Sequence, residues 1–152
     1  MEKPPEYQER LSVPIRWWAQ GTMLVASFWL ALVVAVPEPV AWTATAIAMA
    51  LLVLGLWWFG EARLRVAGDW FVAGRARIEA THLGAADALD AEETRRVSGP
   101  GADARAHLLL RPYVRRAVRV EVTDPRDPAP YWLVSSRHPE ALAAALTALV
   151  KG

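Results

Sequence analysis

The chain has 152 residues and a formal net charge of +1, and residues 60–152 carry fourteen basic and twelve acidic side chains. This charge is too balanced for a nucleic-acid binder that relies on electrostatics, so we expect no nucleic-acid partner. The chain contains no cysteine, which excludes disulfides, thiolate nucleophiles and cysteine-ligated metals and fits a cytosolic domain.

Two uncharged apolar runs of twenty residues, 17–36 and 40–59, dominate the first part of the chain. As helices, each is long enough to cross a hydrocarbon core of ~30 Å at a rise of ~1.5 Å per residue. Only the turn 37–39 separates them. We therefore predict a cytosolic N-terminal segment over residues 1–16 and a transmembrane helical hairpin over residues 17–59.

A secretory signal peptide is the alternative for the first run, because Ala31 and Ala35 resemble the small residues before a cleavage site. The sixteen preceding residues, however, hold as many acids as bases, and the run is longer than the apolar core of most signal peptides. A second apolar run also follows at once. These features favour the hairpin.

Arginines flank the hairpin on the side of its two outer ends, with Arg10 and Arg16 before it and Arg63 and Arg65 after it. Because Lys and Arg concentrate on the cytoplasmic side, we expect a multi-pass protein of the inner (cell) membrane with both termini in the cytoplasm. Tryptophans at both ends of the runs agree with interfacial anchors, at one face Trp17, Trp18, Trp57 and Trp58 and at the other Trp42.

No ionisable residue lies within the two runs, which favours an anchor over a transporter or a proton pathway. Ala44 and Ala48 in the second run have the spacing that lets helix backbones approach closely. They pack either within the hairpin or against a partner helix.

The remaining residues, 60–152, alternate in polarity over short stretches, which is typical of strands. The expected strands are 62–66, 70–73, 75–80, 82–89 with a kink or bulge at Gly84, 106–110, 117–123 and 131–135. Asp90 and Glu93 have the spacing of a capping box before a short helix over 91–97. Pro139 begins an amphipathic helix over 139–150. We predict an α+β protein whose strands form a small bent sheet or barrel closed by the C-terminal helix.

Several segments resemble an actinobacterial family of small two-span membrane proteins classed as a domain of unknown function. The similar segments are Tyr7-x-Glu9-Arg10-Leu11, Gly74-Arg75-Ala76-Arg77-Ile78, Asp103-Ala104-Arg105-Ala106, Arg111-Pro112-Tyr113-Val114-Arg115 and Pro130-Tyr131-Trp132-Leu133-Val134-Ser135-Ser136-Arg137. The resemblance implies two N-terminal spans and a cytosolic domain with a bacterial pleckstrin-homology-like (PH-like) fold. It implies no catalytic or ligand-binding residues.

A cluster of basic residues is the best candidate for a lipid- or partner-binding surface, namely Arg111, Tyr113, Arg115, Arg116 and Arg119. Near an anionic leaflet each arginine contributes roughly 1 kcal/mol to binding. The alternative is a solvated strand face balanced by neighbouring acids. Val118 and Val120 are expected to face the core, so Arg119 is expected to point outward.

The two tryptophans of this part, Trp70 and Trp132, are expected to pack in the core. Tyr131 neighbours Trp132 on the opposite sheet face, so we expect one of the two to be exposed. The three histidines show no metal-ligand spacing, and Ser135 and Ser136 lack the surroundings of an esterase nucleophile. We expect no catalytic residue, metal or cofactor.

These patterns favour a non-enzymatic integral membrane protein that presents a binding or scaffolding domain at the cytoplasmic face, accessory to a membrane or envelope complex. Its expected partners are the lipid bilayer, anionic head groups and a membrane protein. An anionic-lipid sensor is the alternative, and a membrane-bound enzyme ranks last because no nucleophile, base and orienting group can be assembled from local motifs.

Overall fold

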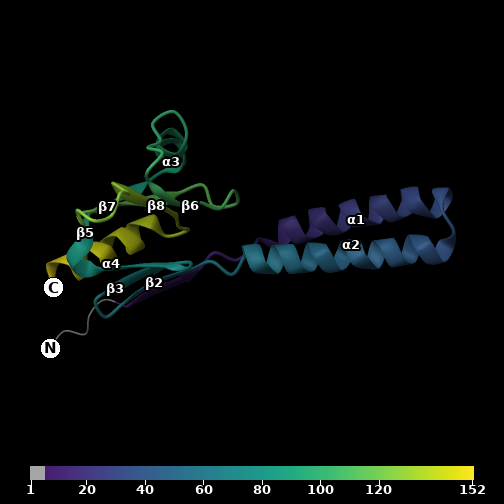
Figure 1. Ribbon diagram of the computed structural model, residues 1–152, viewed down its shortest axis with the longest axis horizontal. Coiled ribbons are helices and arrows are strands. Elements are labelled where there is room, and N and C mark those ends of the chain that lie inside the picture. The colour runs from purple at the N-terminus through teal and green to yellow at the C-terminus, as the bar shows by residue number, and fades with distance from the viewer. Residues whose placement is uncertain (1–5) are drawn as a thin grey trace. The chain divides into compact units, whose positions relative to one another are not determined.

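The computed structural model describes residues 6–152, which divide into two compact units. Residues 12–61 form a helical hairpin, and residues 6–11 together with 62–152 form an α+β domain with two sheets (Figure 1). The described chain thus confirms an α+β protein with four α-helices.

The hairpin consists of α1 (Ile15–Ala35) and α2 (Glu38–Phe59), each long and apolar enough to cross a lipid bilayer. Both helices begin two residues earlier than the apolar runs. Pro14 and Pro37 are the N-cap residues, and Pro39 lies in the first turn of α2, where a missing N–H costs no helical hydrogen bond. The connection between the two helices is therefore shorter than the predicted turn 37–39.

Small residues bring α1 and α2 together. Ala41 is fully buried, and a Cβ on Gly21 would lie 2.7 Å from Leu52 Cδ1, so a larger residue there would require the Leu52 side chain to shift. Ala44 and Ala48, at helical spacing from Ala41, are half-buried. This placement favours packing within the hairpin for that pair.

Sheet A consists of four antiparallel strands in the order β1-β2-β3-β4, namely β1 (Tyr7–Arg10), β2 (Arg63–Ala67), β3 (Trp70–Ala73) and β4 (Ala76–Glu79). Glycines with positive φ, Gly68 at 60° and Gly74 at 61°, form the turns on both sides of β3. The left-handed backbone at these turns suits glycine because it has no Cβ.

Strand β1 changes the predicted domain boundary. It pairs with β2 in the register Tyr7↔Val66 and Arg10↔Arg63, so residues 7–10 belong to the domain that we predicted to begin at residue 60. The sequence gives little sign of this strand because it is short and one of its inward residues is the charged Glu9.

Sheet B has the order β5-β7-β8-β6, with β5 (Leu83–Leu89), β7 (Ala117–Val122), β8 (Tyr131–Ser135) and β6 (His107–Leu109). Strand β6 runs parallel to β8, and the other pairs are antiparallel. The register of β5 shifts between Leu83 and Ala86, which confirms the bulge predicted at Gly84. A Cβ on Gly84 would lie 2.9 Å from Glu121 Cβ.

The main core lies between the two sheets and around α4 (Pro139–Lys151), which Figure 1 shows between them. Leu142 and Leu146 of α4 are fully buried, as are Phe71 of sheet A and Val118 of sheet B. The strands thus form two sheets, where we expected one bent sheet or barrel. The 3-10 turn Ala80–His82 separates β4 from β5, and the two sheets are not hydrogen-bonded into one.

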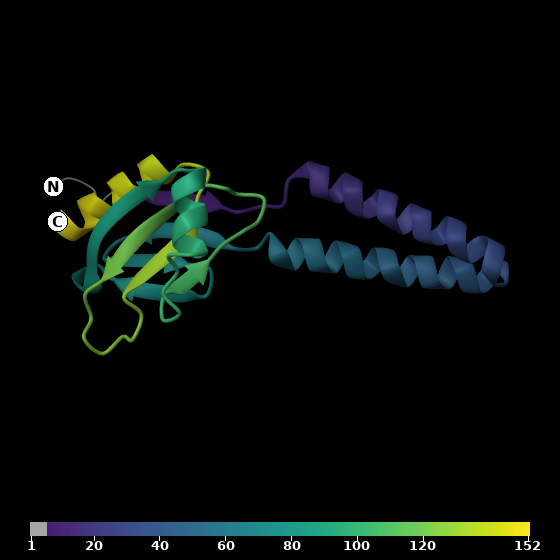
Figure 2. The same cartoon turned by 90° about the horizontal axis from the view of Figure 1, so that it is seen from above.

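The other face of sheet B is also covered. Helix α3 (Ala91–Ser98) lies over it (Figure 2), and a second cluster forms around Ala117, Tyr131 and Leu133. Tyr131 and Trp132 are therefore both buried, at 7% and 5% exposure, and the expectation that one of them is exposed was wrong.

Trp70 differs from the expected core position. Its side chain is 42% exposed, and the guanidinium of Arg77 lies 5.2 Å from its ring centroid. Trp70 is on the side of sheet A that faces away from α4, because its neighbour Phe71 takes the inward position.

Candidate functional site

The predicted basic cluster does not form one surface. Arg111 and Arg115 line a cavity, whereas Tyr113, Arg116 and Arg119 each contact a different part of the domain. Sequence proximity suggested one patch, but residues 110–116 connect β6 to β7 and turn so that successive side chains diverge.

The cavity has a volume of about 420 Å³ and lies between α3 and the segment 110–115. Helix α3 contributes Thr94, Arg95 and Ser98, the segment contributes Arg111 and Arg115, and Ser135 of β8 adds a hydroxyl. The backbone N–H of Arg111 donates to Ser135 Oγ at 2.9 Å. The segment is thereby held against the end of β8.

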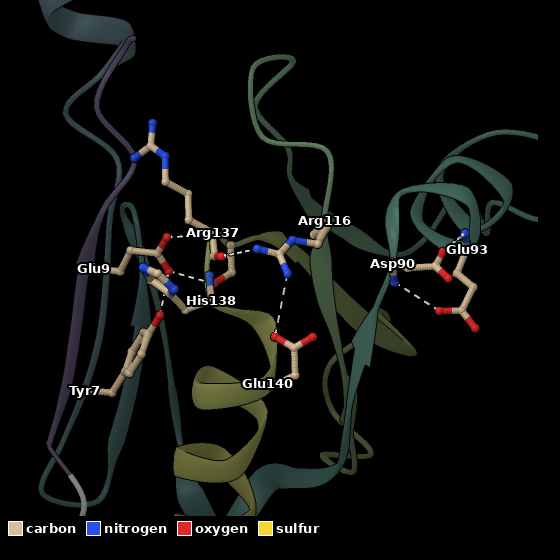
Figure 3. Close-up of polar contacts among 9 residues, drawn as sticks. Tyr7, Glu9, Asp90, Glu93, Arg116, Arg137, His138 and Glu140 are labelled. Atoms are coloured by element: carbon tan, nitrogen blue, oxygen red, sulfur yellow. Dashed lines mark hydrogen bonds and ion pairs between the residues drawn. The ribbon is translucent and has the colours of Figure 1, made fainter.

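Local contacts on α3 fix the side that faces the cavity. The predicted capping box is present, with Glu93 N–H donating to Asp90 Oδ1 at 2.8 Å and Asp90 N–H donating to Glu93 Oε2 at 3.0 Å (Figure 3). Glu92 pairs with Arg96 at 3.5 Å on the exposed side. Arg95 is left on the cavity side, and no residue that lines the cavity in the described chain is acidic.

Tyr113 ties the domain together outside the cavity. Its hydroxyl donates to the Leu11 carbonyl oxygen at 2.7 Å, and the Arg137 guanidinium lies 6.0 Å from its ring centroid. Burial raises the pKa of the Tyr113 hydroxyl. Tyr113 therefore holds Leu11, the residue that follows β1.

Arg116 and Arg119 also have structural contacts. Arg116 donates to the Arg137 carbonyl oxygen at 2.6 Å and lies 3.9 Å from Glu140, which joins the start of β7 to the start of α4 (Figure 3). Arg119 points away from the main core, as its alternation with Val118 predicts. It is nevertheless half-buried, with its guanidinium 4.7 Å from the centroid of the Tyr131 ring.

The buried carboxylate of Glu9 is the polar centre that the sequence does not reveal. Its Oε2 accepts hydrogen bonds from Tyr7 Oη at 2.7 Å and Ser136 Oγ at 2.6 Å, and its Oε1 accepts from the Arg137 N–H at 2.7 Å (Figure 3). Burial, the largest cause, raises the pKa of Tyr7 to about 12. Glu9 and Ser136 are 127 positions apart, so no local motif links them.

Arginines dominate the outer face of sheet A, which we call the basic face. The register places on it four arginines and one acid, together with Gln8, Ala67, Trp70 and Val72; the charged members are Arg10, Arg63, Arg65, Arg77 and Glu79. Arg65, Val72 and Arg77 are directly opposite one another on adjacent strands. Glu6 and Asp69 border this face in sequence.

The predicted membrane anchors lie at the ends of the hairpin helices. Trp17 and Trp18 are in the first turn of α1, Trp57 and Trp58 are in the last turn of α2, and Trp42 is near the start of α2. The rings of Trp42, Trp57 and Trp58 are more than half exposed. Trp42 Nε1 donates to Glu38 Oε1 at 3.4 Å.

Within residues 6–152 no group of three acidic or histidine side chains is placed to hold a metal ion. His107 packs against Trp132, with ring centroids 4.8 Å apart, and His138 is exposed at the N-cap of α4. The oxygens of the buried Glu9 are occupied by internal donors. His107 and Glu9 therefore have structural surroundings.

The fold defines a class of protein with two bilayer-length apolar helices inserted between β1 and β2 of a two-sheet α+β domain. Residues 6–146 match the family described as "Protein of unknown function (DUF3093)", and the chain belongs to this family. The match confirms the resemblance to a domain of unknown function. Neither the curated proteins nor the solved structures gave a significant match.

Proposed function

We propose that the protein is a non-enzymatic, multi-pass cell-membrane protein that presents a PH-like binding and scaffolding domain at the cytoplasmic face. Its basic face docks on anionic lipid head groups and thereby orients the domain for a partner in a membrane or envelope complex. The observation that carries this proposal is the set of arginines around Trp70 on the outer face of sheet A.

The apolar hairpin supports the membrane part of the proposal. Large side chains such as Leu24, Val34 and Trp58 are 72%, 87% and 67% exposed, and each helix is apolar around its whole circumference. A helix of this kind is stable when other protein or lipid covers it. Within the hairpin only one face of each helix is covered, so lipid is the proposed environment of the rest.

Charge supports the cytoplasmic orientation. Arg16 is in the first turn of α1, and Arg63 follows the end of α2 by four positions, whereas the only charged residue near the connection between the helices is Glu38 at the start of α2. An excess of arginine marks the cytoplasmic side. Both chain termini are then cytoplasmic.

The two packed sheets and the C-terminal helix support the PH-like part. In this arrangement α4 fills the space between sheets that share one apolar core, and the outer face of sheet A stays open. An open sheet face suits a binding domain. The hydrogen bonds to Glu9 support a non-enzymatic role. A carboxylate that accepts three internal hydrogen bonds has little capacity left for a substrate.

Charge complementarity selects anionic lipid as the occupant of the basic face. Each arginine contributes about 1 kcal/mol when it lies near an anionic leaflet. Trp70 adds an amphipathic ring of the kind that favours the head-group region. Strand β1 ends five residues before α1, and β2 starts four residues after α2, so only short segments connect sheet A to the hairpin.

A single spin label tests this docking. The chain has no cysteine, so Val72→Cys gives a unique attachment site on the basic face, and Ala144→Cys gives a matched site on the exposed side of α4. The full-length protein is placed in nanodiscs of phosphatidylcholine alone or with phosphatidylglycerol. Collision of the nitroxide with a water-soluble paramagnetic nickel complex reports its exposure to water.

We expect phosphatidylglycerol to protect the label at position 72 but not the label at position 144, and high salt to remove the protection. The double variant Arg65→Gln/Arg77→Gln should abolish this protection, whereas Arg126→Gln, which changes an exposed arginine of the 124–130 loop, should not. Equal exposure at position 72 in both kinds of nanodisc would contradict the docking.

An anionic-lipid sensor is the second candidate function. The arginine-lined cavity favours it, because a cavity selects one head group where an open face does not. A sensor would lose lipid selectivity on substitution of Arg111 and Arg115, with docking through the basic face unchanged.

A further inference from the structure

We propose that the cavity between α3 and residues 110–115 is a binding site for the phosphate group of a phosphate ester. The site is separate from the basic face, because it lies on the side of sheet B that α3 covers. Its existence does not depend on the docking proposed above.

Three arginines from two different elements line this cavity. Arg95 comes from α3, and Arg111 and Arg115 come from the segment before β7. Like charges repel, and the lining of the cavity within the described chain contains no acid; the acids Asp90 and Glu93 at the start of α3 are engaged in the capping box. A bound dianion would offset this repulsion and accept charge-assisted hydrogen bonds.

Two hydroxyl groups at the cavity give independent support for a bound ligand. Thr94 lines the cavity with only 7% exposure, and its Oγ1 has no hydrogen-bond partner among residues 6–152. A buried hydroxyl without a partner costs free energy, which a ligand oxygen would recover. Ser135 Oγ accepts from the Arg111 N–H, so its own hydrogen remains to be donated.

The mixture of donors favours phosphate over a simple carboxylate. A phosphate group has three or more oxygens in a tetrahedral arrangement and can receive donors from several directions at once. Here arginines approach from α3 and from the facing segment, and hydroxyls lie on α3 and β8. A carboxylate offers two oxygens in one plane, so it would receive fewer donors from these different directions than a tetrahedral phosphate.

The size of the cavity indicates an ester rather than inorganic phosphate. Its volume of about 420 Å³ lies within the range of small-molecule sites, roughly 300–1,000 Å³. Leu110, Pro112 and Val114 form an apolar part of the lining. An organic group attached to the phosphate would cover these side chains, and the ester is either soluble or part of a phospholipid head group.

Calorimetric titration of the full-length protein in phosphatidylcholine nanodiscs tests the site, with inorganic phosphate and glycerol 3-phosphate as probes. We expect saturable binding of both probes, with glycerol 3-phosphate binding more tightly. Arg115→Gln should weaken binding about tenfold through the loss of one charge-assisted contact, and Thr94→Val should weaken it about threefold. Arg115 is exposed, so its substitution leaves the packing intact.

Arg96→Gln is the matched control, because Arg96 is on the same helix but pairs with Glu92 on the outer side. Its affinity for both probes should stay within twofold of the wild type. Absence of saturable binding, or equal weakening by Arg96→Gln and Arg115→Gln, would overturn the site. A thermal melt of each variant verifies that the domain is folded.

A second arm distinguishes the two sources of phosphate. When nanodiscs contain phosphatidylglycerol, competition that abolishes the binding of glycerol 3-phosphate identifies a lipid head group as the occupant. Unchanged binding identifies a soluble phosphate ester. The spin label at position 72 reports docking of the basic face in the same samples, so loss of one interaction is distinguishable from loss of the other.

Discussion

Sheets A and B each have four strands, but their coverage differs. Sheet B is covered by an apolar cluster on each side, the main core on one and the α3 cluster around Leu133 on the other. Sheet A is covered on one side only, and its other side carries arginines beside the exposed Trp70. The difference indicates that sheet B holds the domain together, whereas sheet A leaves a face for binding.

Chain connectivity follows the same division. The helical hairpin is inserted between β1 and β2 of sheet A, while the cavity that we propose for phosphate is built on sheet B. Strand β1 is short and exposes a charged residue at its end, so its attachment depends on the Glu9 hydrogen bonds and on the bond from Tyr113 to Leu11. Strand β1 thus adds polar contacts to its pairing with β2, whereas sheet B is packed against apolar residues on both sides.

The largest expected effect comes from truncation of the doubly covered sheet. Leu133→Ala removes a fully buried side chain of β8 and should lower the free energy of unfolding by about 3 kcal/mol. Val72→Ala on the basic face should cost less than about 1 kcal/mol, because that side chain is only partly buried. Urea titration of the full-length protein in detergent, followed by hydrogen exchange of β7 and β8 amides, measures both. Equal losses of unfolding free energy for the two variants would contradict the difference in coverage between the sheets.

Glu9 tests the polar attachment of sheet A. Glu9→Ala leaves three buried or half-buried donors without their acceptor and should cost about 2–3 kcal/mol. In this variant, amide hydrogen exchange should rise first in β1 and β2, ahead of β7 and β8. Glu9→Gln keeps the shape and one acceptor oxygen, so it should recover part of the loss. A uniform rise in exchange across both sheets would show that β1 is not a separate attachment.

Alkaline pH should weaken the same contact. The pKa of Tyr7 is raised to about 12 in the folded protein from 10.0, mainly by burial. The protonated hydroxyl therefore contributes stability that is fully present below pH 10 and is lost as the pH rises from 10 toward 12. Tyr113, whose pKa is also raised, adds a loss of the same sign. Urea midpoints measured across this range should fall, and the midpoints of the Tyr7→Phe variant should fall less steeply. Parallel curves for the two proteins would exclude this role of Tyr7.

Elements with a local pattern were predictable from the sequence. The bounds of β3, β8 and the start of α4 agree with the alternation of side chains and the position of Pro139, and the capping box at Asp90 was read correctly. Strand β1 was not recognised as part of the domain, because its partners are more than fifty positions away and Glu9 interrupts its apolar pattern. Long-range pairing is the information that local spacing lacks.

The candidate site shows the same limit. Arg111 and Arg115 were identified from their clustering in the sequence, but Arg95 and Thr94 were missed because the cavity exists only where α3 lies against the segment 110–115. Tyr131 was misjudged for the same reason, since α3 and its neighbours cover a sheet face that alternation alone marks as open. Spacing reveals which residues share a strand face but not what later covers that face.

The smallest effect concerns α3, the cover of sheet B. Asp90→Ala removes the N-cap acceptor of an eight-residue helix and should cost about 1 kcal/mol, whereas Glu92→Ala removes only an exposed ion pair and should cost about 0.3 kcal/mol. Because a helix this short has little stability of its own, exchange in α3 should rise while the amides of β7 and β8 stay protected. Fraying of α3 would also loosen Arg95, so binding of glycerol 3-phosphate should weaken in Asp90→Ala and not in Glu92→Ala. Equal exchange in α3 for the two variants would show that packing on Leu133, rather than the cap, holds the helix in place.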